Sequence, residues 1–362
     1  MGTISSKRIA FLVVCCLVCL RSAAVHAHDT TTVHCLFSQD WEGKQAMLVV
    51  KVLYQPPIIV KATVFNRKAD FTITLPEPSP AYIWLEGKKE DYQLFIDSPA
   101  IYVSFDQTAF VTGSPSSELW AEQLAMLTTN QESEGDLRTE LAHAFFDNDS
   151  LAIRNLEQLD DSLKTAHTNQ LVKQILDHPS SASSWFLFAS NHFSYNRTLD
   201  LFGKLSAFSS YPSFKRIQAK LAKNQVDTKV TDFTLPTVTG QSFTLSTLKA
   251  TYILIDFSSR FFAACHRRHN ALKQIYRTYH PRGLEIVTVS LEFDSTASRN
   301  DMQQENLPWI HLLDLMGPTS ISNQFGVEQM PDTILLSAGQ TVLGRDMSVS
   351  EIEATLSRLL KK

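Results

Sequence analysis

Two nearly continuous apolar runs in the last third of the chain constrain its fold more than any other feature. They are Tyr252–Phe257 (YILIDF) and Gly283–Leu291 (GLEIVTVSL). Apolar residues at successive rather than alternate positions predict strands that are covered on both faces of a sheet. Three further elements are predicted around them: a helix at about Ala264–Tyr279, a strand at Asp332–Leu336 and an amphipathic helix at Ser348–Leu360. This order predicts an α/β domain over residues 226–362.

The N-terminal third has a different pattern, in which short alternating segments are rich in Val, Ile, Tyr and Phe. Turn residues such as Pro56-Pro57 and Pro76–Pro80 separate them. Regular short strands with such turns predict an antiparallel β sandwich or barrel, here over residues 28–115. His34 and Cys35 are adjacent, so in a strand they point to opposite faces and cannot hold one metal ion together. We interpret Cys35 as a small core residue.

Residues 116–225 are expected to be helical. Trp120, Leu124 and Leu127 recur at helical spacing. The run Gln131–Asp136 (QESEGD) is predicted to be a loop, and the aromatic stretch Trp185–Phe188 is predicted to be buried. The middle of the chain is therefore expected to connect the β-rich domain to the α/β domain through packed helices.

Residues 1–27 have the organisation of a secretory signal peptide. Lys7 and Arg8 precede the apolar run Ile9–Leu20, and Val25-His26-Ala27 offers a cleavage point. The apolar run has 12 residues, whereas a membrane-spanning helix needs about 20. We therefore expect an exported chain with no transmembrane segment after the signal is removed.

Charge and cysteine content narrow the possible functions of the mature chain. The segment 1–27 carries three basic residues and no acid, so its removal changes the formal net charge from −4 to −7. That charge argues against nucleic acid as a partner. Of five cysteines only Cys35 and Cys265 remain, too few for a disulfide scaffold. No cofactor is predicted, and the sequence specifies no oligomeric state.

Several short motifs of the last third stand in a characteristic order. They are Thr231–Leu235 (TDFTL), Gly240–Ser246 (GQSFTLS), Leu307-Pro308-Trp309 and Phe325–Thr333 (FGVEQMPDT). With them the region resembles the thioredoxin superfamily, specifically the exported TlpA/ResA-like, AhpC/TSA-related branch. The resemblance implies a thioredoxin fold, a cis peptide bond before Pro331, and a place in the periplasm or cell envelope of a Gram-negative bacterium. The β-rich and helical segments resemble the accessory regions that often precede this unit.

In that family a Cys-x-x-Cys motif lies where a strand ends and a helix begins. The corresponding residues here are Phe262-Ala263-Ala264-Cys265, so a phenylalanine replaces the attacking cysteine and Cys265 has the resolving position. The resemblance also assigns Asp256 to the family's buried acid. Because thiol–disulfide exchange needs an attacking thiolate, dithiol chemistry by the family mechanism is excluded at this site.

Two functional hypotheses follow for a thioredoxin-like protein of this kind. The first is a redox-degenerate binding or accessory module, in which Pro331, Phe262 and Met330 shape a groove for extended polypeptide or another envelope protein. The alternative is an active thiol-disulfide oxidoreductase that uses Cys265 alone or with Cys35, with Asp256 as a second candidate catalytic residue. Neighbouring arginines and histidines and a helix start would favour a Cys265 thiolate, whereas burial would make the thiol inert.

The sequence Cys265-His266-x-x-His269 also suggests metal binding. Residues 265 and 269 share a helix face, but residue 266 points about 100° away. No third ligand is evident in the sequence. We therefore predict no metal site.

Overall fold

The computed structural model describes residues 30–87, 91–105, 109–222, 225–292, 305–317, 319–327 and 329–361, and the predicted signal peptide lies outside them. The described residues form two compact units. The first unit comprises those up to Ser190 together with Ala207–Phe214, and the second comprises Asn191–Ser206 together with those from Lys215 onward. In the described part of the chain, no helix has the length and apolar character needed to cross a membrane.

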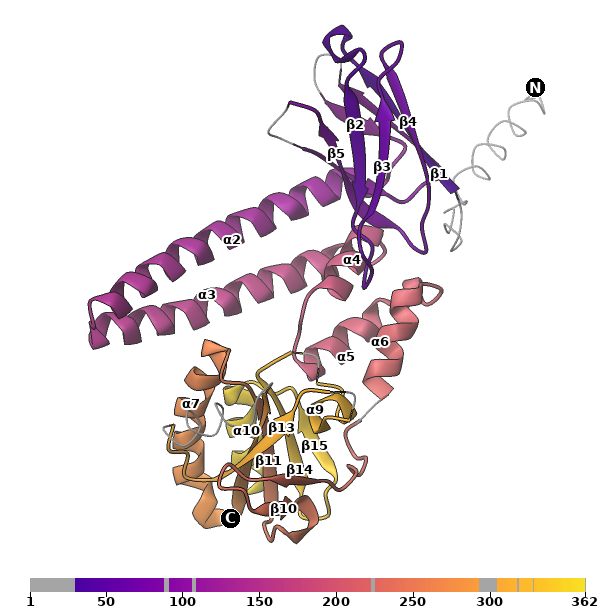
Figure 1. The fold of residues 1–362 in the computed structure, drawn as a ribbon. Coiled ribbons are helices and arrows are strands. Elements are labelled where there is room, and N and C mark those ends of the chain that lie inside the picture. The colour runs from indigo at the N-terminus through magenta and orange to yellow at the C-terminus, as the bar shows by residue number, and fades with distance from the viewer. Residues whose placement is uncertain are drawn as a thin grey trace, which may run out of the picture. The chain divides into compact units, whose positions relative to one another are not determined.

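The first unit contains two four-stranded sheets (Figure 1). One has the order β4-β1-β7-β8, built from Lys68–Thr74, Thr30–Phe37, Ala100–Phe105 and Phe110–Thr112. The other has the order β3-β2-β5-β6, built from Ile58–Thr63, Gln45–Val50, Ser79–Leu85 and Tyr92–Ile96. The expectation of purely antiparallel sheets is wrong at one place, because β1 and β7 pair in parallel. A parallel pair needs a long crossover, and the intervening strands supply it here.

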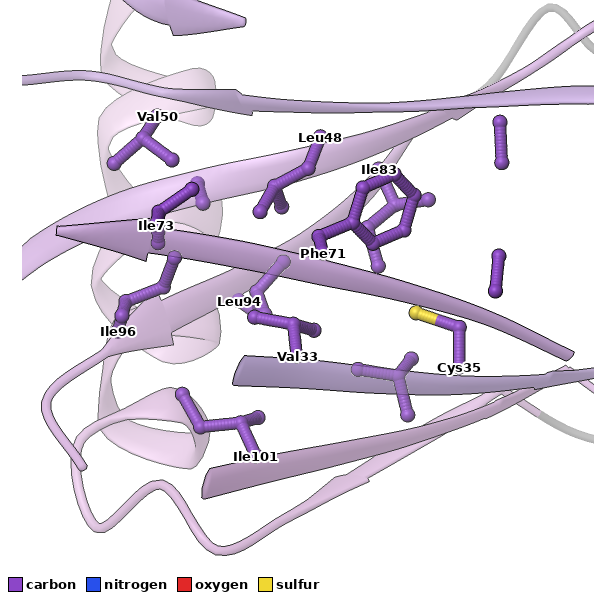
Figure 2. Close-up of a cluster of buried hydrophobic side chains, with 14 of the residues drawn as sticks. Val33, Cys35, Leu48, Val50, Phe71, Ile73, Ile83, Leu94, Ile96 and Ile101 are labelled. Carbon is purple, nitrogen blue, oxygen red and sulfur yellow. The ribbon is translucent and has the colours of Figure 1, made fainter. Parts of the chain in front are cut away.

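The core of the first unit takes side chains from both sheets. Phe71 and Cys35 from one sheet and Leu48 and Ile83 from the other belong to a single buried cluster (Figure 2). The strict alternation of exposed and buried residues along β4 produces this one-sided burial. Cys35 is therefore a core residue, as predicted, and burial raises the pKa of its thiol.

Two long helices follow the sheets. Helix α2 (Ser117–Phe146) and helix α3 (Ser150–Asp177) lie side by side (Figure 1). The loop predicted at Gln131–Asp136 is wrong, because α2 continues through it. Its glutamates and glutamine are good helix formers, and Glu134 binds His167 of α3 with an Oε1–Nδ1 distance of 2.9 Å. A tertiary contact thus outweighs the local polar composition.

Helix α4 (Ala182–Ser190) carries the apolar stretch predicted to be buried. Trp185 is fully buried, and its ring packs against those of Phe208 and Phe214. Its indole nitrogen donates to Ser213 Oγ at 2.8 Å, and Ser213 in turn donates to the Glu77 carboxylate. Aromatic packing and a satisfied polar network therefore join this helix to the strands of the same unit.

The second unit is built on a five-stranded sheet with the order β13-β12-β11-β14-β15. Its strands are Ile310–Leu315, Leu284–Glu292, Tyr252–Ser258, Asp332–Ser337 and Val342–Arg345. The first three are mutually parallel, and β14 and β15 are antiparallel to their neighbours. The shorter strands β9 (Thr234–Pro236) and β10 (Ser242–Thr244) form a hairpin.

Both faces of this sheet are covered. Ile253, Ile255 and Phe257 of β11 belong to one buried cluster and Leu254 to another, which confirms the two-sided burial predicted for this strand. Helices α7 (Ala263–Tyr279) and α10 (Val349–Leu359) supply side chains to the second cluster. Among the described residues of the chain's later part, the other helices are α5 (Tyr195–Lys204), α6 (Pro212–Ala222) and α9 (Ile321–Gln324). Single 3₁₀ turns occur at Gln39–Trp41, Ser206–Phe208, Leu245–Thr247 and His280–Arg282.

Candidate functional site

The candidate site begins where β11 ends and α7 starts. Phe262 directly precedes the helix, its side chain is 50% exposed, and it makes no capping hydrogen bond. The preceding Phe261 is 56% exposed. At the position where the resemblance implies an attacking thiol, the chain therefore presents a pair of aromatic rings to solvent.

Cys265 lies in the first turn of α7 and is only 1% exposed. Burial raises the pKa of its thiol, and hydrogen bonds from the Ser259 backbone and the Ser258 side chain oppose this only in part. Burial thus outweighs the positive charges that surround this cysteine in sequence. Both Cys35 and Cys265 are free thiols, each buried in its own unit.

The peptide bond between Met330 and Pro331 is cis, as the resemblance implies. The next residue, Asp332, pairs in register with Phe257 near the end of β11. Pro331 therefore lies beside the segment that leads out of β11 toward Phe262. Met330 and Pro331 are both partly exposed.

A buried salt bridge fixes the connection between β11 and α7. The Glu292 side chain, at the end of β12, is fully buried and accepts a hydrogen bond from the Arg260 backbone nitrogen at 3.1 Å. Arg260 Nε lies 3.2 Å from the other oxygen of this carboxylate. The guanidinium carbon also lies 4.6 Å from the centre of the Phe261 ring. The Glu292 carboxylate thus holds the turn before the two phenylalanines through both the backbone and the side chain of Arg260.

Asp256 is fully buried in the middle of the unit. Its Oδ2 atom lies 2.9 Å from His269 Nε2 and accepts a hydrogen bond from Thr288 Oγ1 at 3.1 Å. Trp309 Nε1 donates to the same threonine oxygen at 2.9 Å. The partner that the structure gives to Asp256 on α7 is therefore His269.

A second carboxylate approaches from the far side of the histidine. Glu305 Oε1 lies 2.6 Å from His269 Nδ1 and 2.9 Å from His266 Nδ1. Lys273 Nζ donates to the Glu305 backbone oxygen at 3.2 Å. Sequence reasoning missed Glu305, because no periodicity links it to α7; its position shortly before the Leu307-Pro308-Trp309 motif is the only local signal.

The charges of this cluster influence one another strongly. Burial alone would lower the pKa of His269, but hydrogen bonds and charges of Asp256 and Glu305 raise it to about 9. Burial opposes ionisation of Glu305, yet His269 and His266 lower its pKa to about 2. Burial and the positive charge of His269 lower the pKa of His311 to about 4. In this cluster Glu305 is therefore held ionised, and His269 lies between the carboxyl groups of Asp256 and Glu305.

Comparison with known proteins matches residues 226–345 to the AhpC/TSA family. The thiol-disulfide oxidoreductase ResA of Bacillus cereus is 20% identical over 158 residues, which cover 44% of this chain and 90% of ResA. Among solved structures, a thioredoxin-like protein from Bacteroides caccae has 17% identity and a TM-score of 0.41, and the match covers 56% of this chain and 84% of that one.

A thiol-disulfide oxidoreductase from Bacteroides fragilis has 23% identity and a TM-score of 0.34, over 36% of this chain and 99% of that one. All of these proteins are distant in sequence. Residues 226–345, which include Phe262, Cys265 and Pro331, thus match the AhpC/TSA family, and this part of the chain is similar to thiol-disulfide oxidoreductases.

Proposed function

We propose that the thioredoxin-like domain is a redox-degenerate binding module that holds extended polypeptide beside Pro331. One observation carries this proposal: a half-exposed Phe262 stands in the attacking position, while Cys265 is 1% exposed. Phenylalanine supplies no electron pair for attack on sulfur, and a buried thiol with a raised pKa supplies little thiolate. Thiol–disulfide exchange at this site would then lack both an attacking nucleophile and an accessible thiol.

The same residues favour binding. Phe261 and Phe262 expose apolar rings shortly after the end of β11, and the partly exposed Met330 and Pro331 precede Asp332, which pairs in register with Phe257 of that strand. Exposed aromatic side chains are frequent anchors of polypeptide interfaces because they bury a large area with little loss of conformational freedom. An extended segment of an envelope protein is the partner that the resemblance implies.

An insulin-reduction assay with dithiothreitol as electron source tests the loss of chemistry. We expect the wild-type chain and the Cys265→Ser variant to match the rate of the protein-free control. Phe262→Cys is expected to raise the rate, because it restores a dithiol across the first turn of α7. Cysteine-dependent turnover by the wild type would refute the binding-module proposal.

Titration with a permanently unfolded polypeptide, reduced and carboxymethylated α-lactalbumin, tests the binding. Phe262→Ser should weaken the interaction severalfold. Phe110→Ser is a matched control, because Phe110 is 53% exposed but belongs to the first unit. Equal effects of the two substitutions would show that the interaction is not specific to the site.

The alternative function is thiol-disulfide exchange by Cys265 alone or with Cys35. It is favoured by the relationship of the domain to thiol-disulfide oxidoreductases. Alkylation of the native protein followed by mass spectrometry separates the two functions. Rapid labelling of Cys265, or its recovery in a mixed disulfide, would support exchange, and protection of both cysteines would support the binding module.

The location of the protein and the role of its first unit are part of the same proposal. The basic and apolar pattern of residues 1–27 supports export to the periplasm or cell envelope of a Gram-negative bacterium. The two-sheet unit with its helices would then be an accessory region, with a sandwich or barrel as its architecture. Fractionation of cells that express the chain, with mass determination of its N-terminus, tests the export.

A further inference from the structure

We propose that His266, His269 and Glu305 form a binding site for one divalent transition-metal ion, of which zinc is the best match. This inference does not depend on the proposed binding of polypeptide. The sequence supplies the two histidines, and the fold supplies the third ligand that the sequence did not reveal.

The ligand atoms converge on one point. His266 and His269 lie three residues apart on α7, and the Nδ1 atoms of both face Glu305 Oε1. These three atoms all lie within 4.8 Å of one another. Bonds of about 2.0–2.1 Å to a tetrahedral zinc ion would separate the ligand atoms by about 3.3 Å. An outward movement of the Glu305 carboxylate, with adjustment of the two imidazole rings, would bring the three atoms to these separations.

The outer nitrogens of both histidines are already occupied by acceptors. His269 Nε2 lies 2.9 Å from the Asp256 carboxylate, and His266 Nε2 lies 3.2 Å from the Arg260 carbonyl oxygen. A carbonyl or carboxylate oxygen can only accept, so each Nε2 can keep a proton on its acceptor when a metal replaces the proton on Nδ1. In a neutral ring the Nδ1 lone pair is then directed toward Glu305. A metal-binding histidine is usually oriented by such a second hydrogen bond.

A cation at the convergence point would lie between two imidazole nitrogens and one carboxylate oxygen. His266 Nδ1 lies 2.9 Å from Glu305 Oε1. His269 Nδ1 lies 2.6 Å from the same oxygen. A dication at the convergence point would satisfy both nitrogens at once and release the Nδ1 proton of His269 to solvent.

The composition of the site indicates the class of metal. Two imidazoles and one carboxylate suit zinc and its first-row neighbours, whereas magnesium and calcium prefer oxygen ligands. His269 is buried, but the side chain of His266 is 50% exposed. Solvent can therefore supply a fourth ligand, as in three-ligand zinc centres.

Zinc titration of the full chain, without a histidine tag and in competition with a chromophoric chelator, tests the site. We expect one zinc equivalent of the wild type to be lost or weakened at least about tenfold in His266→Asn and in Glu305→Gln. His143→Asn and Glu353→Gln are matched controls, since both residues are exposed and lie on other helices. The controls should retain that equivalent.

A thermal readout and a cobalt spectrum keep the test independent of folding defects. Zinc should raise the unfolding temperature of the wild type and of the controls but not that of Glu305→Gln. Cobalt should give visible absorption that His266→Asn abolishes. If zinc binding and its thermal effect are the same in the two ligand variants as in the wild type, or if the wild type binds no zinc, the site does not exist and the cluster is only an ion pair.

Discussion

His269 Nε2 lies 2.9 Å from Asp256 Oδ2 in a region that excludes solvent from both side chains. The contact joins the central strand β11 to helix α7. A buried charge that loses its partner costs much more than the intact pair contributes. This pair therefore helps to hold α7 against β11.

Replacement of Asp256 tests that role. Asp256→Ala removes the acceptor of both His269 and Thr288 and should lower the free energy of unfolding by about 3–5 kcal/mol. Chemical denaturation measures the change. Glu353→Ala, at an exposed position of α10, is the control and should change stability by less than about 0.5 kcal/mol. Equal stability of the two variants would contradict a structural role for the pair.

The core of the first unit makes a separate prediction. Phe71 is fully buried between the two sheets (Figure 2), so Phe71→Ala should cost about 3–5 kcal/mol of unfolding free energy through lost burial and a cavity. Phe65→Ala is the matched control, because Phe65 is 71% exposed. Denaturant titration of both variants measures the difference. A similar small loss in both would mean that the two sheets do not share a tightly packed core.

The reactivity of Cys265 should depend on pH in an unusual way. Burial raises the pKa of this thiol above that of a free cysteine, so little thiolate exists at neutral pH. Iodoacetamide should therefore label Cys265 slowly in the native protein, with a rate that rises only in alkaline solution. A mass-spectrometric time course between about pH 7 and 10 measures this, with the urea-unfolded chain as the fast reference. Fast labelling at neutral pH would show an activated thiol.

Asp332, which follows the cis proline, makes a pH-dependent contribution to stability. Burial first and then the charge of Asp346 raise its pKa to about 6, against the partial opposition of Arg345 and Arg268. His192 also faces this group and interacts with both acids. Because the folded state holds the Asp332 proton more tightly than the unfolded chain, this stabilisation is complete below about pH 4 and is lost as the pH rises through about 6.

Asp332→Asn should therefore be more stable than the wild type at pH 7, by up to about 3 kcal/mol, and equally stable near pH 3. The neutral side chain keeps an oxygen for the hydrogen bond from the Thr333 backbone nitrogen. Thermal unfolding at several pH values measures the difference. Asp200→Asn, at an exposed position in the same unit, should show no such trend. A wild type that is more stable than Asp332→Asn at pH 7 would reverse the sign.

Local patterns in the sequence were sufficient for the elements of the second unit. The apolar runs at Tyr252–Phe257 and Gly283–Leu291 correspond to β11 and β12 within one residue at each end. Burial on both faces of a strand requires apolar residues at successive positions, so it can be predicted without knowledge of the neighbouring strands and helices.

Contacts between segments that are distant in sequence determined the features that local patterns did not predict. The continuity of α2 through Gln131–Asp136 depends on packing against α3, and the parallel pairing of β1 with β7 joins strands separated by many residues. The sequence by itself determined the order of strands and helices in the second unit and the placing of Phe262 three residues before Cys265. Only the tertiary structure placed Glu305 against His266 and His269, because 36 residues separate Glu305 from His269 and no local periodicity reports a contact between a helix and a distant segment.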